Sequence, residues 1–190
     1  MPAVKIPATI AAEVAVPVMG RAATAAGFAL LSIFWPSATN QVLAYSLAAF
    51  MVISAKFIWD YASAPSAPKS VRGPYAVAAV AMIIAGLVMA FRPETLVVAI
   101  AAAAAWILAG LLEILVFVKH RNAFAPYRDQ LVTGFVSLGV GGSLLLGLDL
   151  DAHGLLGLAG GGAIILAVFE LISAFGLRHA AKEPEPGLWS

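Results

Sequence analysis

The chain has 190 residues, of which 62% are hydrophobic and 11% are charged, and its formal net charge at pH 7 is +1. Soluble globular domains contain about 45–50% apolar and about 25% charged residues, so this composition predicts an integral membrane protein. There is no basic domain and no basic stripe interleaved with aromatic residues, so no nucleic-acid partner is expected. The absence of cysteine excludes disulfides, thiolate metal sites and cysteine nucleophiles.

The N-terminal residues 1–13 are expected to form a loose or interfacial cytoplasmic tail that is not cleaved as a signal. Glu13 interrupts the apolar run, and Pro7 and Pro17 disfavour a continuous helix there. A membrane domain is predicted for residues 14–177 and a cytoplasmic C-terminal tail for residues 178–190.

Six stretches are long and apolar enough to cross the hydrocarbon core, which takes about 20 residues of helix. In chain order they cover residues 14 or 22 to 35, 41–59, 75–91, 95–118, 131–148 and 154–177. Very short turns join the first stretch to the second, the third to the fourth and the fifth to the sixth, whereas longer connections join these pairs. The sequence therefore predicts an all-α membrane protein of six transmembrane helices, arranged as three antiparallel helical hairpins.

A period of 57 residues relates the three hairpins. Lys56, Glu113 and Glu170 follow this period, and so do Pro36 and Pro93 in the turns. A fixed period predicts three copies of one structural unit. The copies cover about residues 14–64, 72–121 and 128–178. The pattern does not decide whether the three hairpins close into a ring.

The basic residues predict the orientation in the membrane. Ten of the eleven fall on one side if both tails and the two long connections share that side. These ten are Lys5, Arg21, Lys56, Lys69, Arg72, Lys119, Arg121, Arg128, Arg178 and Lys182, and Arg92 lies on the opposite side. The positive-inside rule then places both termini in the cytoplasm, with the lipid bilayer as the expected partner.

Small residues at intervals of four predict where helices approach one another closely. They are Ala101, Ala105 and Ala109, then Gly139, Ser143 and Gly147, and finally Gly157 and Gly161. Lipid supplies no hydrophobic drive between helices, so small side chains let backbones come into contact. We interpret these stripes as packing within one chain rather than as a dimerisation signal.

Glu113, Glu170 and Lys56 form a candidate intramembrane charged cluster. The two glutamates lie about 9 and 12 Å inside the ends of their predicted helices, where a charge needs a partner or a purpose. In a structural interpretation, the carboxylates hold the bundle together through polar contacts. In a functional interpretation, the two carboxylates share a proton and sense or relay protons. We expect the structural role to come first.

The partners of the basic residues stay open at this point. Lys56 pairs either with Asp60, four residues further on, or with a glutamate of another repeat. Arg21 is an intramembrane counter-charge if the first helix begins at the earlier of its two limits, and a cytoplasmic anchor if it begins at the later one. Pro17 and Gly20 favour the later start.

The turn that contains Asp149, Asp151 and His153 is a candidate pH-responsive site on the external face, since unperturbed histidine is charged below about pH 6.5. Three ligands on one short turn do not fix a coordination sphere, so no metal site is predicted and a solvated turn is the simpler interpretation. The glycine runs at 139–142 and 160–162 lack the pattern of a phosphate loop. No nucleophile with a positioned base is suggested, so neither an enzyme nor a cofactor is expected.

Four short motifs point to a known family. They are the turns Trp35-Pro36-Ser37-Ala38-Thr39 and Arg92-Pro93-Glu94-Thr95, and the helical segments Gly110-Leu-Leu-Glu113-Ile-Leu and Val168-Phe-Glu170-Leu-Ile-Ser-Ala174. With these motifs and six spans in three hairpins, residues 14–178 resemble the HdeD-like family of small bacterial inner-membrane proteins. The third repeat departs from the pattern with Asp149 and Leu150 where the proline would fall, and the first with Lys56 in place of glutamate.

The resemblance implies a bacterial plasma-membrane protein connected with resistance to acid or another envelope stress, with no catalytic site to carry over. Two other hypotheses belong to different classes, namely a small proton-linked transporter or channel and an accessory subunit of a larger membrane complex. Assembly as a homo-oligomer also stays open.

Overall fold

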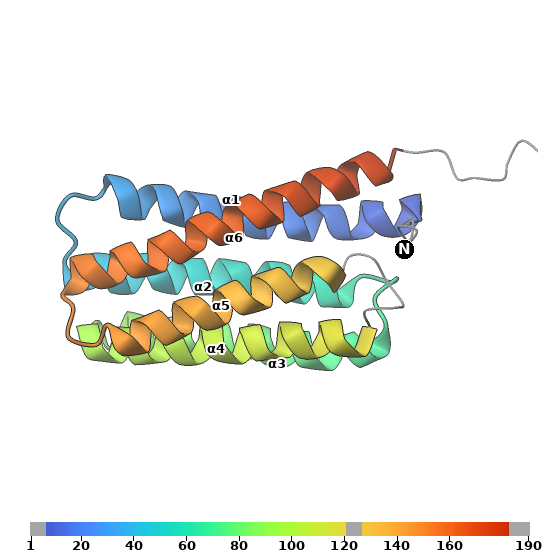
Figure 1. Ribbon diagram of the computed structural model, residues 1–190. Coiled ribbons are helices and arrows are strands. Elements are labelled where there is room, and N and C mark those ends of the chain that lie inside the picture. Colours follow the sequence, from blue (N-terminus) through green and yellow to red (C-terminus); the bar gives the residue numbers. More distant parts are fainter. Residues whose placement is uncertain (1–6, 121–126, 183–190) are drawn as a thin grey trace, which may run out of the picture.

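The computed structural model describes residues 7–120 and 127–182, and within these ranges the backbone forms six α-helices (Figure 1). They are α1 (Ala8–Phe34), α2 (Asn40–Ser63), α3 (Lys69–Phe91), α4 (Thr95–His120), α5 (Tyr127–Leu146) and α6 (Ala152–Ala180). By length and composition all six can cross a membrane, and the described ranges contain no strand. The chain is therefore an all-helical, multi-pass integral membrane protein, as its composition predicts.

Most helices extend beyond the predicted spans. The first begins at Ala8, directly after Pro7, so that residues 8–13 are helical and do not belong to a tail. The last continues to Ala180. Because the hydrocarbon core takes only about 20 residues of helix, the additional turns reach into the headgroup region. Outside the described residues lie the remaining predicted tail segments 1–6 and 183–190, together with Arg121.

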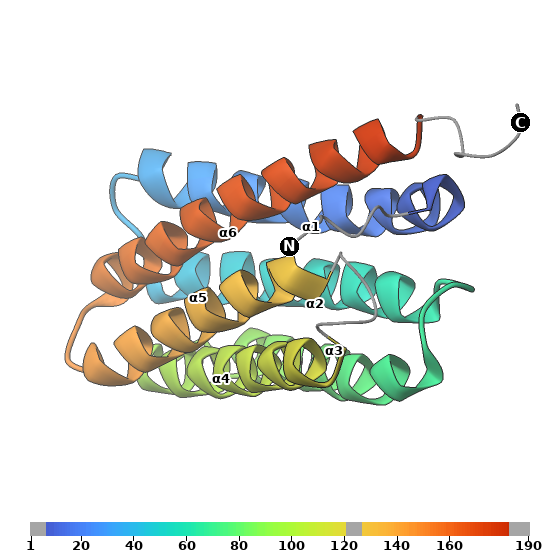
Figure 2. The ribbon, with the colours of Figure 1, turned by 45° about the vertical axis from the view of Figure 1, so that its right-hand side comes forward.

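The six helices form a closed ring of antiparallel neighbours (Figures 1 and 2). Each helix packs against the next one in the chain, and α6 packs against α1 to close the ring. The most extensive contacts join helices of different predicted hairpins, namely α2 with α3, α4 with α5 and α6 with α1. Contacts between the hairpins therefore contribute more to the packing than contacts within them.

The two ends of the bundle differ in their connections. The links α1–α2, α3–α4 and α5–α6 lie at one end, on the left of Figure 1, which we name the turn end. The start of α1, the end of α6 and the α2–α3 connection lie at the opposite end, which we name the loop end. Basic residues at the helix ends follow this division. Lys69, Arg72, Lys119, Arg178 and Lys182 belong to the loop end, and Arg92 to the turn end.

Glycines permit the close approach of α4 and α5. These glycines are not the ones in the predicted stripes. A Cβ atom added at Gly110 would lie 2.6 Å from the carbonyl oxygen of Gly134 in α5. A Cβ atom at Gly139, Gly157 or Gly161 would meet nothing within 4 Å. Spacing alone did not identify the packed face, because glycine and alanine occupy several faces of these helices.

Gly110→Ala is expected to lower the free energy of unfolding by about 1–3 kcal/mol, because the new methyl group must displace the backbone of α5. The matched control is Gly139→Ala, which should be neutral or should stabilise the helix by up to about 1 kcal/mol through its higher helix propensity. Thermal unfolding in detergent measures both variants. Equal melting temperatures would contradict the close packing of α4 on α5.

Candidate functional site

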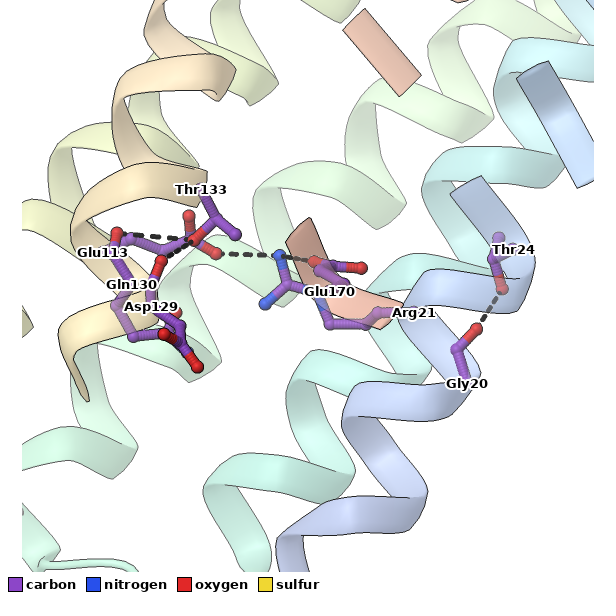
Figure 3. A network of polar contacts seen from close by, with 8 residues as sticks. All are labelled: Gly20, Arg21, Thr24, Glu113, Asp129, Gln130, Thr133 and Glu170. Atoms are coloured by element: carbon purple, nitrogen blue, oxygen red, sulfur yellow. Dashed lines mark hydrogen bonds and ion pairs between the residues drawn. The ribbon is translucent and has the colours of Figure 1, made fainter. Parts of the chain in front are cut away.

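A buried ion triad links three helices inside the bundle (Figure 3). The guanidinium Nη2 of Arg21 lies 2.9 Å from Oε1 of Glu113 and 2.8 Å from Oε1 of Glu170. These side chains are 14%, 2% and 6% exposed, in the same order. Arg21 belongs to α1, Glu113 to α4 and Glu170 to α6, so the arginine side chain crosses the interior of the ring. We refer to Arg21, Glu113 and Glu170 as the triad.

Arg21 reaches the interior because α1 starts at Ala8, which makes the arginine the central residue of that helix. The alternative start at residue 22 is wrong. Pro17 lies inside α1 and is buried. A proline within a helix removes one backbone hydrogen bond, but burial of an apolar helix face against its neighbours outweighs this loss. Of the two alternatives that the sequence left open for Arg21, the early start therefore supports the intramembrane counter-charge and not the cytoplasmic anchor.

Lys56 does not join the triad, so the predicted cluster of Lys56 with the two glutamates is wrong in this member. Its side chain is 65% exposed, its Nζ pairs with Asp60, and it lies 4.9 Å from the centroid of the Phe57 ring. Phe50, Ser54 and Ile58 are the α2 residues that line the cavity beside the triad, and Lys56 lies two residues from both Ser54 and Ile58. Two residues turn a side chain by about 200° around a helix. The 57-residue period thus aligns Lys56 with the glutamates in sequence but on the opposite face.

Lys56→Gln is expected to change the free energy of unfolding by less than about 1 kcal/mol, because an exposed pair four residues apart contributes little. Thermal unfolding in detergent checks this, with Asp60→Asn as the companion variant. A loss of unfolding free energy as large as that from a buried ion pair would show that Lys56 takes part in the charged cluster.

Asp149, Asp151 and His153 are exposed at the turn end, and His153 precedes Glu170 by 17 residues of α6, so it lies about 25 Å from Glu170 along the helix axis. Oδ1 of Asp151 accepts a hydrogen bond of 2.8 Å from the backbone N–H of Gly154, so this carboxylate caps the N-terminus of α6. Within residues 7–120 and 127–182 there is no group of three or more histidine, aspartate and glutamate side chains that could hold a metal ion.

The triad has one carboxylate more than it has cations. With all three groups ionised its net charge is −1, and Oε2 of Glu113 is buried without a hydrogen-bond partner among the described residues. A buried charge that lacks a partner is costly in a medium of low dielectric constant. One proton bound by the two carboxylates removes the excess charge and leaves Arg21 paired with the other carboxylate. The arrangement can therefore hold one proton.

Two small cavities border the triad, and each has a volume of about 20 Å³. The inner cavity is lined by all three members of the triad, by Ser54 and Ser137, and by the aromatic side chains of Phe50 and Trp106. The outer cavity lies between Arg21, Glu170 and polar residues near the start of α5. Those residues are Asp129, Gln130 and Thr133, with Ser173 of α6 beside them. A polar cavity of this size has room for one water molecule.

The sequence prediction missed a polar face of α5. Gln130, Thr133 and Ser137 are 6%, 4% and 4% exposed, and they follow one another at spacings of three and four. Residues at i, i+3 and i+7 share one face of a helix. This stripe of uncharged polar residues in an apolar segment is the signal that points to the site.

The chain matches the model of one known protein family. The model of a family described as a short repeat of unknown function, DUF308, matches residues 20–91 and again residues 77–146. The two matches begin 57 positions apart, which is the period found in the sequence. Comparisons with curated proteins and with solved structures found no match. The two matches of this family model thus fit an internal repeat in the chain.

Proposed function

The chain belongs to the DUF308 repeat family, and we propose that it is a non-enzymatic membrane protein which binds a proton and protects the cell against acid or another envelope stress. The proposal includes an HdeD-like relationship, the bacterial plasma membrane as location and the loop end facing the cytoplasm. The observation that carries it is a single guanidinium between two buried carboxylates.

The charge balance of the triad supports acid protection. In the ionised state the bundle contains one uncompensated buried charge, and a proton removes it without the loss of an ion pair. Acidification therefore relieves an unfavourable charge inside the bundle, whereas a surface rich in ion pairs would lose contacts. A bundle of this kind keeps its fold when protons become abundant.

The position of the basic residues supports the orientation. The loop end carries Lys69, Arg72, Lys119, Arg178 and Lys182, and the turn end carries the exposed pair of Arg92 and Glu94. Excess lysine and arginine near helix ends favours the cytoplasmic side. The triad then lies closer to the cytoplasmic ends of α4 and α6 than to their external ends.

Acid challenge of living cells tests the proposal. A strain that lacks the gene is complemented with the wild-type protein, with Glu113→Gln plus Glu170→Gln, or with the control Glu94→Gln, which removes an exposed carboxylate at the turn end. We expect the wild type and the control to restore survival and the double variant to fail at equal membrane abundance. Equal survival of all strains, including the deletion, would overturn the proposal. Proton flux across reconstituted vesicles that disappears in the double variant would instead assign transport.

A further inference from the structure

We propose that protons reach the triad from the loop end alone, through a polar passage formed by Asp129, Ser173, Thr133 and Gln130. The inference rests on the proposed function, since it specifies which aqueous phase exchanges protons with the triad. Asp129 is the residue at which protons enter, and the bundle exchanges protons with the aqueous phase on one side of the membrane only.

The entrance of the passage is an exposed carboxylate that is tied to α6. Asp129 is exposed near the start of α5, and its Oδ2 accepts a hydrogen bond from Oγ of Ser173. Ser173 follows Glu170 by three residues, so the two lie on the same helix face about 4.5 Å apart along the axis. The hydrogen bond therefore connects the surface carboxylate to the helix face that carries Glu170.

The outer cavity lies between Asp129 at the entrance and the triad. Oε1 of Gln130 is buried without a hydrogen-bond partner among the described residues, and Gln130 lines the outer cavity together with Asp129 and Glu170. Oγ1 of Thr133 donates to the backbone carbonyl oxygens of α5 and borders the same cavity. A water molecule needs two to four polar partners, and this cavity supplies them. One water molecule then links Asp129 to Glu170.

Titratable groups face this region from all six helices. They are Arg21 of α1, Tyr61 of α2, Tyr75 of α3, Glu113 of α4, Asp129 of α5 and Glu170 of α6. Arginine and tyrosine side chains keep their protons throughout the acid range. The three carboxyl groups are therefore the members that exchange protons, and Asp129 is the exposed one among them.

An aromatic layer covers the side of the triad that faces the turn end. Phe28, Phe50 and Trp106 are at most 5% exposed, and the ring centroids lie 5.0 Å apart for Phe28 and Phe50 and 5.6 Å for Phe50 and Trp106. Phe28 follows Arg21 by seven residues and Trp106 precedes Glu113 by seven, so the layer lies about 10 Å toward the turn end. Apolar cavities and packed rings exclude water, which confines proton exchange to the loop end.

Each step of the proton transfer breaks one O–H bond and forms another. The carboxylate of Asp129 takes a proton from the aqueous phase and passes it through the water molecule to Glu170, after which Asp129 is ionised again. The triad gains one proton, and no other bond forms or breaks. Release follows the same route in reverse, so protons are bound and returned rather than carried across the membrane.

Infrared spectroscopy of the full-length protein in lipid vesicles tests the passage. After transfer into D₂O at acid pH, the C=O band of the protonated triad carboxyl group shifts as its proton is replaced by a deuteron. Asp129→Asn and Gln130→Leu should slow this shift by about tenfold or more, because the first removes a positioned proton-transfer group and the second removes a polar partner of the water molecule. Glu94→Gln is the matched control at the turn end, and it should leave the rate unchanged.

The amplitude and the rate of the shift separate the two proposals. If the wild type shows no such band, or if the band is unaffected by Glu113→Gln plus Glu170→Gln, the proposed function fails and the passage fails with it. If the band is present and its rate in Asp129→Asn and Gln130→Leu equals that of the wild type, only the passage is overturned. A slowing of equal size in Glu94→Gln would also overturn entry from the loop end.

Discussion

Arg21→Leu should destabilise the protein by about 3–5 kcal/mol, more than a single substitution of either glutamate of the triad. It removes the cation and leaves Glu113 and Glu170 close together and unpaired, and breaking a buried ion pair by deleting one partner costs this much. The melting temperature and the yield of folded protein in detergent measure the loss. Arg21→Lys should retain part of the stability, because a lysine supplies the charge without the planar guanidinium.

Two controls connect this loss to charge rather than to packing. In the Arg21→Leu background, Glu113→Gln plus Glu170→Gln should restore most of the stability, because no buried charge then remains. Lowering the pH should act in the same direction, since protons neutralise the two carboxylates. A triple variant as unstable as Arg21→Leu itself would show that the arginine contributes mainly through its apolar contacts.

The second large effect is a non-additive response of the two glutamates. Glu113→Gln or Glu170→Gln alone balances the charge of Arg21 with one carboxylate, so each should change the free energy of unfolding by no more than about 1 kcal/mol. The double variant leaves Arg21 buried without a counter-charge and should lose about 3–5 kcal/mol. Melting temperatures of the three variants in one detergent measure this order. Additive losses from the two single variants would contradict the charge count of the triad.

The fold could be predicted because lipid imposes strong constraints on sequence. Runs of about 20 apolar residues, short proline-containing turns and the 57-residue period were enough to predict six helices in hairpins. Closure of the ring through α1 and α6 was not predictable, since it depends on which helix faces meet. The glycine stripes were correct only in part for the same reason, since Gly147 lies against Leu158 of α6 whereas Gly139, Gly157 and Gly161 meet nothing within 4 Å.

The site was predicted in part. The cost of charge in lipid singled out Glu113 and Glu170, and both lie in the triad. Arg21 was left open because prolines obscured the start of α1, and Lys56 was misassigned because a period in sequence carries no information about helix rotation. Gln130 was missed because an uncharged polar residue costs less in a membrane than a charged one and gives a weaker signal.

An infrared pH titration of the buried carboxyl band decides whether the triad holds one carboxylate in excess of its cation. The wild type and the Glu94→Gln control should show the C=O band of one protonated carboxyl group on acidification. Glu113→Gln and Glu170→Gln should each lose it, since the remaining carboxylate stays ionised beside Arg21. A band that persists in either single variant, or that is missing from the wild type, would contradict an excess carboxylate in the triad.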